Sequence, residues 1–223
     1  MDIATGQIQG ARRRQEDSFA VETLEDGARL FLVADGLGGL PAGDVASREA
    51  SAEFVRDFRD QARAQRGLPH DWMRHALNEA DDHLHRRQST QPDLAGMSTT
   101  LVALYVRDGD ACALSVGDSY LLLLRNDVLY VLNELHRGEG SALTSCVGAQ
   151  LRQIWVLDTL KVEPGDRFLL ATDGITTLGG NAIKERLRAA DSSQAAVDGL
   201  LEAIEGALLA HQDNATLVAI RVP

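Results

Sequence analysis

Residues 30–36 have the sequence Leu-Phe-Leu-Val-Ala-Asp-Gly. An uninterrupted apolar run of this length is typical of a strand that is buried on both faces. The run stops at Asp35-Gly36, a dipeptide that is typical of a turn. Because burying an unpaired carboxylate is costly, Asp35 at the end of such a strand needs a proton, a cationic partner or a metal ion.

Two other apolar strands end in the same way. Asp173 follows the run 168–172 and precedes Gly174, and Asp118 follows the run 114–117. Two more acidic positions border predicted strands: Glu16-Asp17 follows the arginines at 12–14, and Asp213 stands just before the last strand. The sequence therefore places acidic side chains repeatedly at strand ends.

Hard divalent cations would compensate these carboxylates, because all-oxygen ligand sets suit Mg²⁺ or Mn²⁺. Two such ions close together can polarise a bridging water and hold a phosphoryl oxygen. Taken alone, each Asp-Gly is more simply a turn, and arginines 12–14 could neutralise part of the charge. The order of the whole set is what favours a metal site.

The apolar pattern predicts an α+β fold with one domain over residues 1–223. Ala46, Ala50, Phe54 and Phe58 recur every four residues, which predicts an amphipathic helix. We expect helices over 44–64 and 71–88 and around 197–208, and strands over 18–23, 30–34, 98–107, 111–117, 119–125, 128–132, 154–162, 167–172 and 215–222. Short turns between the middle strands favour antiparallel sheets covered by helices over a parallel sheet.

Composition narrows the classes of partner. The formal net charge is -11, which disfavours binding to a nucleic-acid backbone. No stretch reaches the ~20 apolar residues of a membrane helix, and the first residues do not resemble a signal peptide. Cys112 and Cys146 lie far apart in sequence and are interpreted as buried thiols. We therefore expect a cytoplasmic protein, a monomer, with neither a nucleic acid nor a membrane as partner.

Six segments in order carry a family resemblance. The chain resembles the type 2C, metal-dependent protein serine/threonine phosphatases in the segments 10–19 (GARRRQEDSF), 34–43 (ADGLGGLPAG), 96–100 (GMSTT), 116–119 (VGDS), 171–174 (ATDG) and 213–216 (DNAT). Together they span nearly the whole chain, so the match is specific. The resemblance implies a four-layer α-β-β-α sandwich, with two antiparallel sheets flanked by helix pairs.

The resemblance also implies roles for the acidic residues. Asp35 would bridge two Mn²⁺ or Mg²⁺ ions, and Asp173 and Asp213 would complete one of the two sites. Glu16 and the carbonyl of Gly36 would complete the other site. A third, weaker ion would lie between Asp118 and Asp173.

The substrate of such an enzyme is a protein phosphorylated on serine or threonine by a cognate kinase. By the same resemblance, Arg12 would bind the substrate phosphate and Asp17 would orient the attacking water. That water is activated by the two-metal centre, and no phosphoenzyme forms.

The chain departs from the family pattern at four places. Gln15 replaces an asparagine, and Tyr120 replaces an arginine. Leu37 stands where animal relatives carry a histidine thought to be the general acid. The largest departure lies between Leu132 and Arg152, where a short connection replaces most of the family's flap, as in a compact bacterial-type member.

Two alternatives remain open. One is a catalytically weak binding module with the same fold, and the other is a narrow regulatory-switch phosphatase with a single antagonist as substrate. Other candidate residues have simpler interpretations. His83 and His85 do not share a helix face, so the histidines at 75, 83 and 85 are interpreted as solvated. Ser98 has no evident base partner and is interpreted as a turn residue.

Overall fold

Two five-stranded sheets form the centre of the molecule. The computed structural model describes residues 1–37, 42–65, 67–138 and 142–223. One sheet has the order β1-β10-β9-β6-β7, and it comprises β1 (Asp2–Ile8), β6 (Tyr120–Arg125), β7 (Val128–Val131), β9 (Arg167–Ala171) and β10 (Ala215–Arg221). The other has the order β2-β3-β4-β5-β8, and it comprises β2 (Asp17–Thr23), β3 (Arg29–Asp35), β4 (Leu101–Arg107), β5 (Asp110–Val116) and β8 (Trp155–Lys161). All neighbouring strands are antiparallel.

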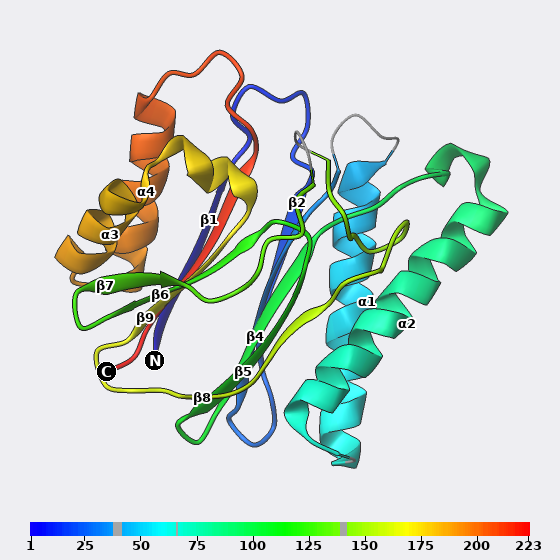
Figure 1. Cartoon of the computed structure of the whole chain (residues 1–223), viewed down its shortest axis with the longest axis horizontal. Coiled ribbons are helices and arrows are strands. Elements are labelled where there is room, and N and C mark those ends of the chain that lie inside the picture. Colours follow the sequence, from blue (N-terminus) through cyan, green and yellow to red (C-terminus); the bar gives the residue numbers. More distant parts are fainter. Residues whose placement is uncertain (38–41, 66, 139–141) are drawn as a thin grey trace.

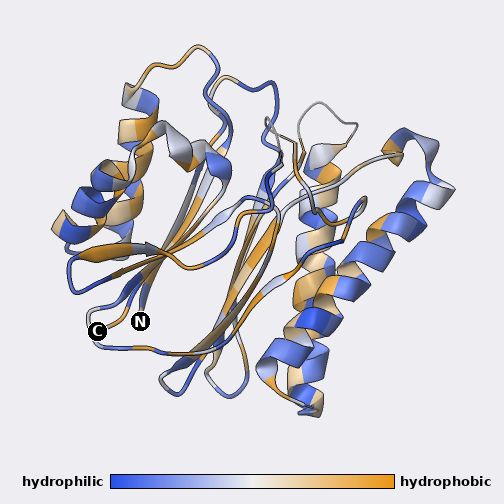
Figure 2. Ribbon diagram, viewed as in Figure 1, coloured by the Kyte–Doolittle hydropathy of each residue, from blue (hydrophilic) through white to orange (hydrophobic). Residues whose placement is uncertain are grey.

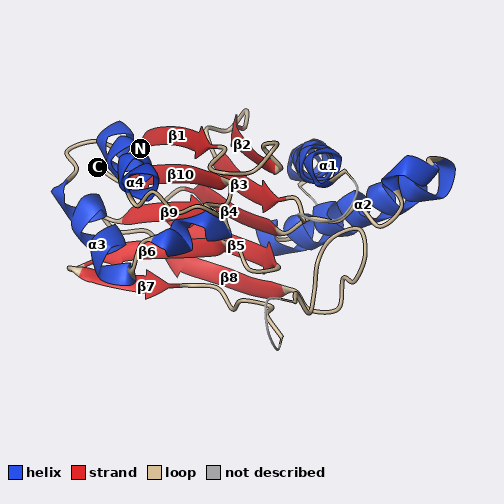
Figure 3. Cartoon of the chain, turned by 90° about the horizontal axis from the view of Figure 1, so that it is seen from above, coloured by secondary structure: helices blue, strands red, loops and turns tan. Residues whose placement is uncertain are grey.

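Helix pairs cover the outer faces of both sheets (Figure 1). Helices α1 (Gly43–Ala64) and α2 (Pro69–Thr90) pack on the β2–β8 sheet. Helices α3 (Gly180–Ala189) and α4 (Ser193–Gly206) pack on the β1–β7 sheet. Two short 3-10 helices, η1 (Pro92–Leu94) and η2 (Asp173–Thr177), complete the elements. The view from above shows the strands in two layers between the helices (Figure 3). The predicted four-layer sandwich is confirmed.

Each layer boundary is apolar. Phe31, Val33 and Phe168 belong to the cluster between the two sheets, and all three are almost fully buried. The predicted stripe of Ala46, Ala50, Phe54 and Phe58 on α1 is fully buried against the β2–β8 sheet. Colouring by hydropathy shows the apolar residues of the helices turned toward the sheets (Figure 2). Residues 30–34 are therefore buried on both faces, as their apolar run predicts.

Most predicted elements lie within a few residues of the observed ones, with four differences. Strand β1 and helix α3 were not predicted. Residues 98–100 precede β4 instead of belonging to it, and their backbone bonds to the neighbouring segments, for example from Leu37 N to Ser98 O. Helix α4 ends at Gly206, and Leu208 beyond it is 88% exposed instead of lying on the inner face. In the described residues, no helix is long and apolar enough to cross a membrane.

Candidate active site

Asp17 and Asp35 lie opposite each other on two paired strands. Asp17 begins β2 and Asp35 ends β3, and the two are direct partners in the register. The buried Asp17 Oδ2 accepts hydrogen bonds from Thr172 Oγ1 at 2.8 Å and from Thr216 Oγ1 at 2.7 Å. Asp17 Oδ1 is also buried but has no hydrogen-bond partner among the described residues. This orphaned oxygen is the kind of atom that a bound ion or ordered water satisfies.

The backbone at Gly36 has no room for a side chain. A Cβ there would lie 2.1 Å from the carbonyl oxygen of Gly43 and 2.7 Å from that of Glu16. This close approach brings the start of α1 and the Glu16 loop against the end of β3. Thr100 fixes the preceding residue, because its backbone N donates to Asp35 O and its Oγ1 accepts from Asp35 N, both at 2.9 Å. The other glycines of this motif, Gly38 and Gly39, lie outside the described residues.

Asn214 holds the arginine-rich loop against the start of β10. Its Nδ2 donates to Gln9 O at 2.7 Å and to Arg14 O at 3.0 Å, and its Oδ1 accepts from Glu16 N at 2.8 Å. The neighbouring Asp213 forms an ion pair with Arg12. A single Asp-Asn pair therefore brings Arg12 and Glu16 to the same end of the sandwich as β10.

Asp118 and Asp173 complete the group from two other strand ends. Asp173 begins η2 and is separated from β9 by Thr172, and Asp118 follows β5 after a glycine. Gly117 has φ +95, and a Cβ there would lie 2.6 Å from Thr100 Cγ2, so the turn that presents Asp118 requires glycine. The structure thus brings together every side chain predicted for the site: Arg12, Glu16, Asp17, Asp35, Asp118, Asp173 and Asp213.

The carboxylates raise one another's pKa values. Burial is the main cause that raises the pKa of Asp35 well above its usual range, and the charges of Asp17, Asp173, Asp118 and Asp213 add to it. Burial also raises the pKa of Asp17 to about 6, against the opposing hydrogen bonds from the two threonines. The pKa of Asp173 rises to about 6 by burial and by the charges of Asp118 and Asp213. The metal-free site is therefore short of positive charge.

One contributor was not predicted from the sequence. Arg137 lies in the segment that connects β7 to β8, and its Nε donates to Asp118 Oδ2 at 2.7 Å. Its Nη2 reaches Asp173 Oδ2 at 3.4 Å. Arg137 is therefore a further countercharge besides arginines 12–14, which the sequence analysis named as able to neutralise part of the charge. The only sequence signal was a lone arginine beside several glycines.

The donor set fits divalent cations. All the candidate ligands are oxygens, and one buried carboxylate oxygen is orphaned. Burial, followed by the charges of acidic neighbours, raises the pKa values of four carboxyl groups, those of Glu16, Asp17, Asp35 and Asp173. In the described part of the chain, no three acidic, histidine or cysteine side chains converge tightly enough to enclose one ion. In this arrangement, guanidinium groups hold three of the carboxylates, those of Asp118, Asp173 and Asp213.

Of the three histidines predicted to be solvated, His75 and His85 are about half exposed and His83 is less so, and each also lies near an acidic side chain. His83 Nε2 lies 3.0 Å from Glu49 Oε2, and His75 Nδ1 lies 2.7 Å from Asp57 Oδ2, so both link α2 to α1. Ser98 is buried, and its Oγ only approaches Gly96 O at 3.5 Å, which agrees with a turn residue.

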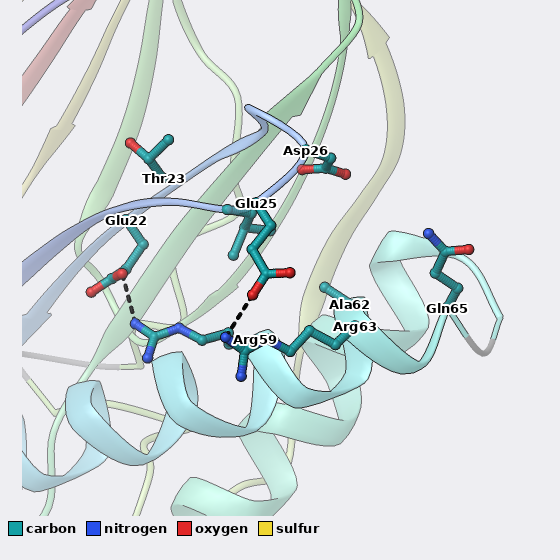
Figure 4. A pocket seen from close by; sticks show the side chains of 9 residues that line it. Glu22, Thr23, Glu25, Asp26, Arg59, Ala62, Arg63 and Gln65 are labelled. Atoms are coloured by element: carbon teal, nitrogen blue, oxygen red, sulfur yellow. Dashed lines mark hydrogen bonds and ion pairs between the residues drawn. The ribbon is translucent and has the colours of Figure 1, made fainter.

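A groove of about 850 Å³ lies away from these carboxylates, between the β2–β3 hairpin and the end of α1. Two ion pairs bridge it, Arg59 with Glu22 and Arg63 with Glu25 (Figure 4). The hairpin is at the opposite end of β3 from Asp35. We therefore assign no part of the chemistry to this groove.

Comparisons with known proteins agree with the geometry. The sequence pattern described as protein phosphatase 2C matches residues 8–216. The serine/threonine phosphatase stp of Listeria monocytogenes is 35% identical over 188 residues, which cover 75% of this chain and 74% of the relative.

Two solved structures are also similar. The catalytic domain of the serine/threonine protein phosphatase PstP, in complex with two manganese ions, superposes with a TM-score of 0.84 at 26% identity, covering 99% of this chain and 98% of that one. PppA, a regulatory component of the type VI secretion system (T6SS) of Pseudomonas aeruginosa, has a TM-score of 0.81, also at 26% identity and with the same coverage. The chain belongs to the protein phosphatase 2C family of metal-dependent protein serine/threonine phosphatases.

Proposed function

We propose that this chain hydrolyses phosphoserine and phosphothreonine in proteins at the carboxylate cluster described above, with two Mn²⁺ or Mg²⁺ ions. The observation that carries the proposal is that acidic residues from five separate segments, together with Arg12, meet at one end of the sandwich. No structural reason accounts for so many mutually repelling carboxylates, whereas divalent cations would balance them.

In this proposal, Asp35 would contribute to both ion sites. Asp173 and Asp213 would contribute to one of them, and Glu16 with the Gly36 carbonyl to the other. When bound, Mn²⁺ or Mg²⁺ supplies Lewis-acid activation of the attacking water and offsets the negative charge that develops on the phosphoryl oxygens. Raised pKa values at Asp35 and Asp173 support this assignment, because both groups gain a countercharge on binding a cation.

Arg12 binds the substrate phosphate. Its side chain is 44% exposed, and its one ion-pair partner in the described part of the chain is Asp213, so it can turn outward when that carboxylate binds a metal ion. A planar guanidinium suits two phosphate oxygens at once. The predicted role of Asp17 is to orient the attacking water. Its orphaned Oδ1 supports this role, because that oxygen can accept a proton in a hydrogen bond while two threonines hold Oδ2.

The same proposal includes direct attack by water, without a phosphoenzyme. Ser98, the serine of the third motif, is buried with its Oγ directed to a backbone carbonyl, which leaves it without a base. The general acid stays unassigned, since Leu37 occupies the position where animal relatives carry histidine.

The short segment 133–150 supports an open site with little preference for the sequence around the phosphate. Among its described residues there is neither a helix nor a named strand, and Asn133, His136, Ser145 and Val147 turn inward. Selection of a real partner would then depend on docking elsewhere on the surface, which raises the effective concentration of substrate at the site.

Three further parts of the proposal are one catalytic domain over 1–223, a monomeric state and a cytoplasmic location. The last is supported by Cys112 and Cys146, which are buried and unpaired, as expected of a reducing compartment. A regulatory-switch phosphatase with a narrow range of substrates remains the second candidate. With an open rim, the choice of substrate would depend on an unknown docking surface.

Hydrolysis of p-nitrophenyl phosphate tests the proposal. We expect turnover with millimolar Mn²⁺, its loss in excess EDTA and its return on adding Mn²⁺ back. The Asp35→Asn variant, purified in the same way, should be inactive under all these conditions and controls for contaminating phosphatases. Full activity in excess chelator would exclude the metal mechanism, and no activity in any condition would favour the binding module.

A further inference from the structure

Arg137 bridges two carboxylates that come from different sheets. Asp118 follows β5 in one sheet, and Asp173 follows β9 in the other. The guanidinium donates through Nε to Asp118 Oδ2 at 2.7 Å and through Nη2 toward Asp173 Oδ2 at 3.4 Å. Two of its nitrogens therefore face the pair to which the family resemblance assigns a third, weaker ion.

The backbone around Arg137 is anchored on the turn that presents Asp118. His136 N donates to Gly117 O at 2.9 Å, and Gly117 N donates to the buried His136 Nδ1 at 3.1 Å. On the other side, Thr144 N donates to His136 O at 2.9 Å. Since two hydrogen bonds join residue 136 to residue 117, the backbone position of Arg137 is fixed close to Asp118.

Charge explains why a cation is needed between these two residues. The Asp118 side chain is only 11% exposed, and Arg137 is its single basic partner among the described residues. The positive charge of Arg137 also lowers the pKa of Asp173, against its burial and its acidic neighbours. Removing Arg137 would leave two adjacent carboxylates without a countercharge, which is costly at a buried position.

We propose that Arg137 is a built-in cation that takes the place of a third metal ion between Asp118 and Asp173. The inference rests on the proposed function, because it presumes that the remaining carboxylates hold two ions. The short segment between β7 and β8 places the fixed positive charge of Arg137 at the position where a weakly bound ion would otherwise bind. The native chain is then a two-ion enzyme, and Asp118 is a partner of arginine instead of a metal ligand.

The test counts bound Mn²⁺ instead of measuring turnover. The purified chain is titrated with Mn²⁺, and the bound ions are obtained from the loss of the electron paramagnetic resonance signal of free aqueous Mn²⁺. We expect two ions on the native chain and one more on Arg137→Gln. The added ion should bind at least about tenfold more tightly than any third ion on the native chain, because it no longer competes with a charge-assisted pair.

Arg107→Gln is the matched control. Arg107 is 39% exposed, against 37% for Arg137, and it also lies near two aspartates, Asp26 and Asp108. Arg107 is the last residue of β4. Thr100, which contacts Asp35, comes just before the first residue of that strand, so Arg107 is remote from the site. This variant should bind as many ions as the native chain. The double variant Arg137→Gln/Asp118→Asn should lose the added ion, and Arg137→Lys should fall between Arg137→Gln and the native chain.

Melting curves supply a second readout. Without metal, Arg137→Gln should melt below the native chain, and Mn²⁺ should raise its melting temperature by more than it raises that of the native chain. Equal numbers of bound ions and equal affinities in the two proteins would overturn the inference and leave the two-ion proposal intact. Fewer ions on Arg137→Gln would also overturn it. A native chain that binds no Mn²⁺ at all would refute the proposed function together with the inference.

Discussion

Asp17 makes the metal-free protein less stable as the pH rises. Burial raises its pKa from 3.8 to about 6, so the folded state holds a proton that the unfolded state has released between these values. Since the folded state binds more protons, this contribution to stability is complete below pH 4 and is lost as the pH rises through 6. A shift of about 2 pKa units corresponds to about 3 kcal/mol at pH 7.5.

Asp17→Asn removes this contribution, together with the part of the raised pKa of Asp35 that is due to the charge of Asp17. Asparagine keeps an oxygen that can accept from Thr172 and Thr216, and it carries no charge to desolvate. In EDTA at pH 7.5, we expect the variant to be more stable than the native chain by up to about 3 kcal/mol, or roughly 6–12 °C in melting temperature. The gap should narrow below pH 6 and vanish near pH 4. Asp173, with its pKa also near 6, adds to the same trend in both proteins.

The assay is urea or thermal unfolding in EDTA between pH 4.5 and 8, with the difference between the two proteins plotted against pH. Asp108→Asn is the control, because it removes one negative charge from a side chain that is 84% exposed. A gap between Asp17→Asn and the native chain that is constant over this range would refute the reasoning. So would a variant that is less stable than the native chain at pH 7.5.

Two further predictions concern turnover. Asp35→Asn should lose most of kcat. Arg12→Ala should mainly raise KM, if the contact of Arg12 with the phosphate is equally strong in the ground and transition states. Unchanged kcat and KM in Arg12→Ala would contradict the assignment of Arg12 to phosphate binding. Across short phosphopeptides, kcat/KM should vary by less than ~100-fold, equivalent to ~2.7 kcal/mol, whereas an intact phosphoprotein with a docking surface should exceed them all. A wider spread among the peptides would mean that the rim itself discriminates.

The strand-end aspartates could be predicted because two local signals coincide. Residues 30–34 and 168–171 are apolar without interruption, which indicates burial on both faces, and an aspartate follows each run within two residues. Antiparallel strands joined by short turns bring such ends to a common edge, as Asp17 and Asp35 show in the register of β2 and β3. Chain order and composition were therefore sufficient to predict most residues of this site.

Strand β1 and helix α3 lacked such signals. In β1, only Ala4 is buried, and Gly6 has no side chain to show that it packs under Val197 and Leu201 of α4. Helix α3 buries only Ile183 and Leu187, which is too few to define a helical period. Strand β1 depends on contacts with α4 and β10, which are distant from it in sequence, and helix α3 packs on α4, β6 and β7. These contacts leave no pattern along the chain.

Arg137 shows the same limit at the site itself. Its neighbours in sequence, Gly138 and the buried His136, are typical of an irregular loop, and nothing local indicates an acidic partner. The partner is set by two backbone-anchored hydrogen bonds between residues 117 and 136, which are 19 positions apart. We infer that the short segment 133–150 has a second consequence besides the proposed open rim. One of its side chains, Arg137, reaches the carboxylates from the path between β7 and β8 and so changes the charge of the site.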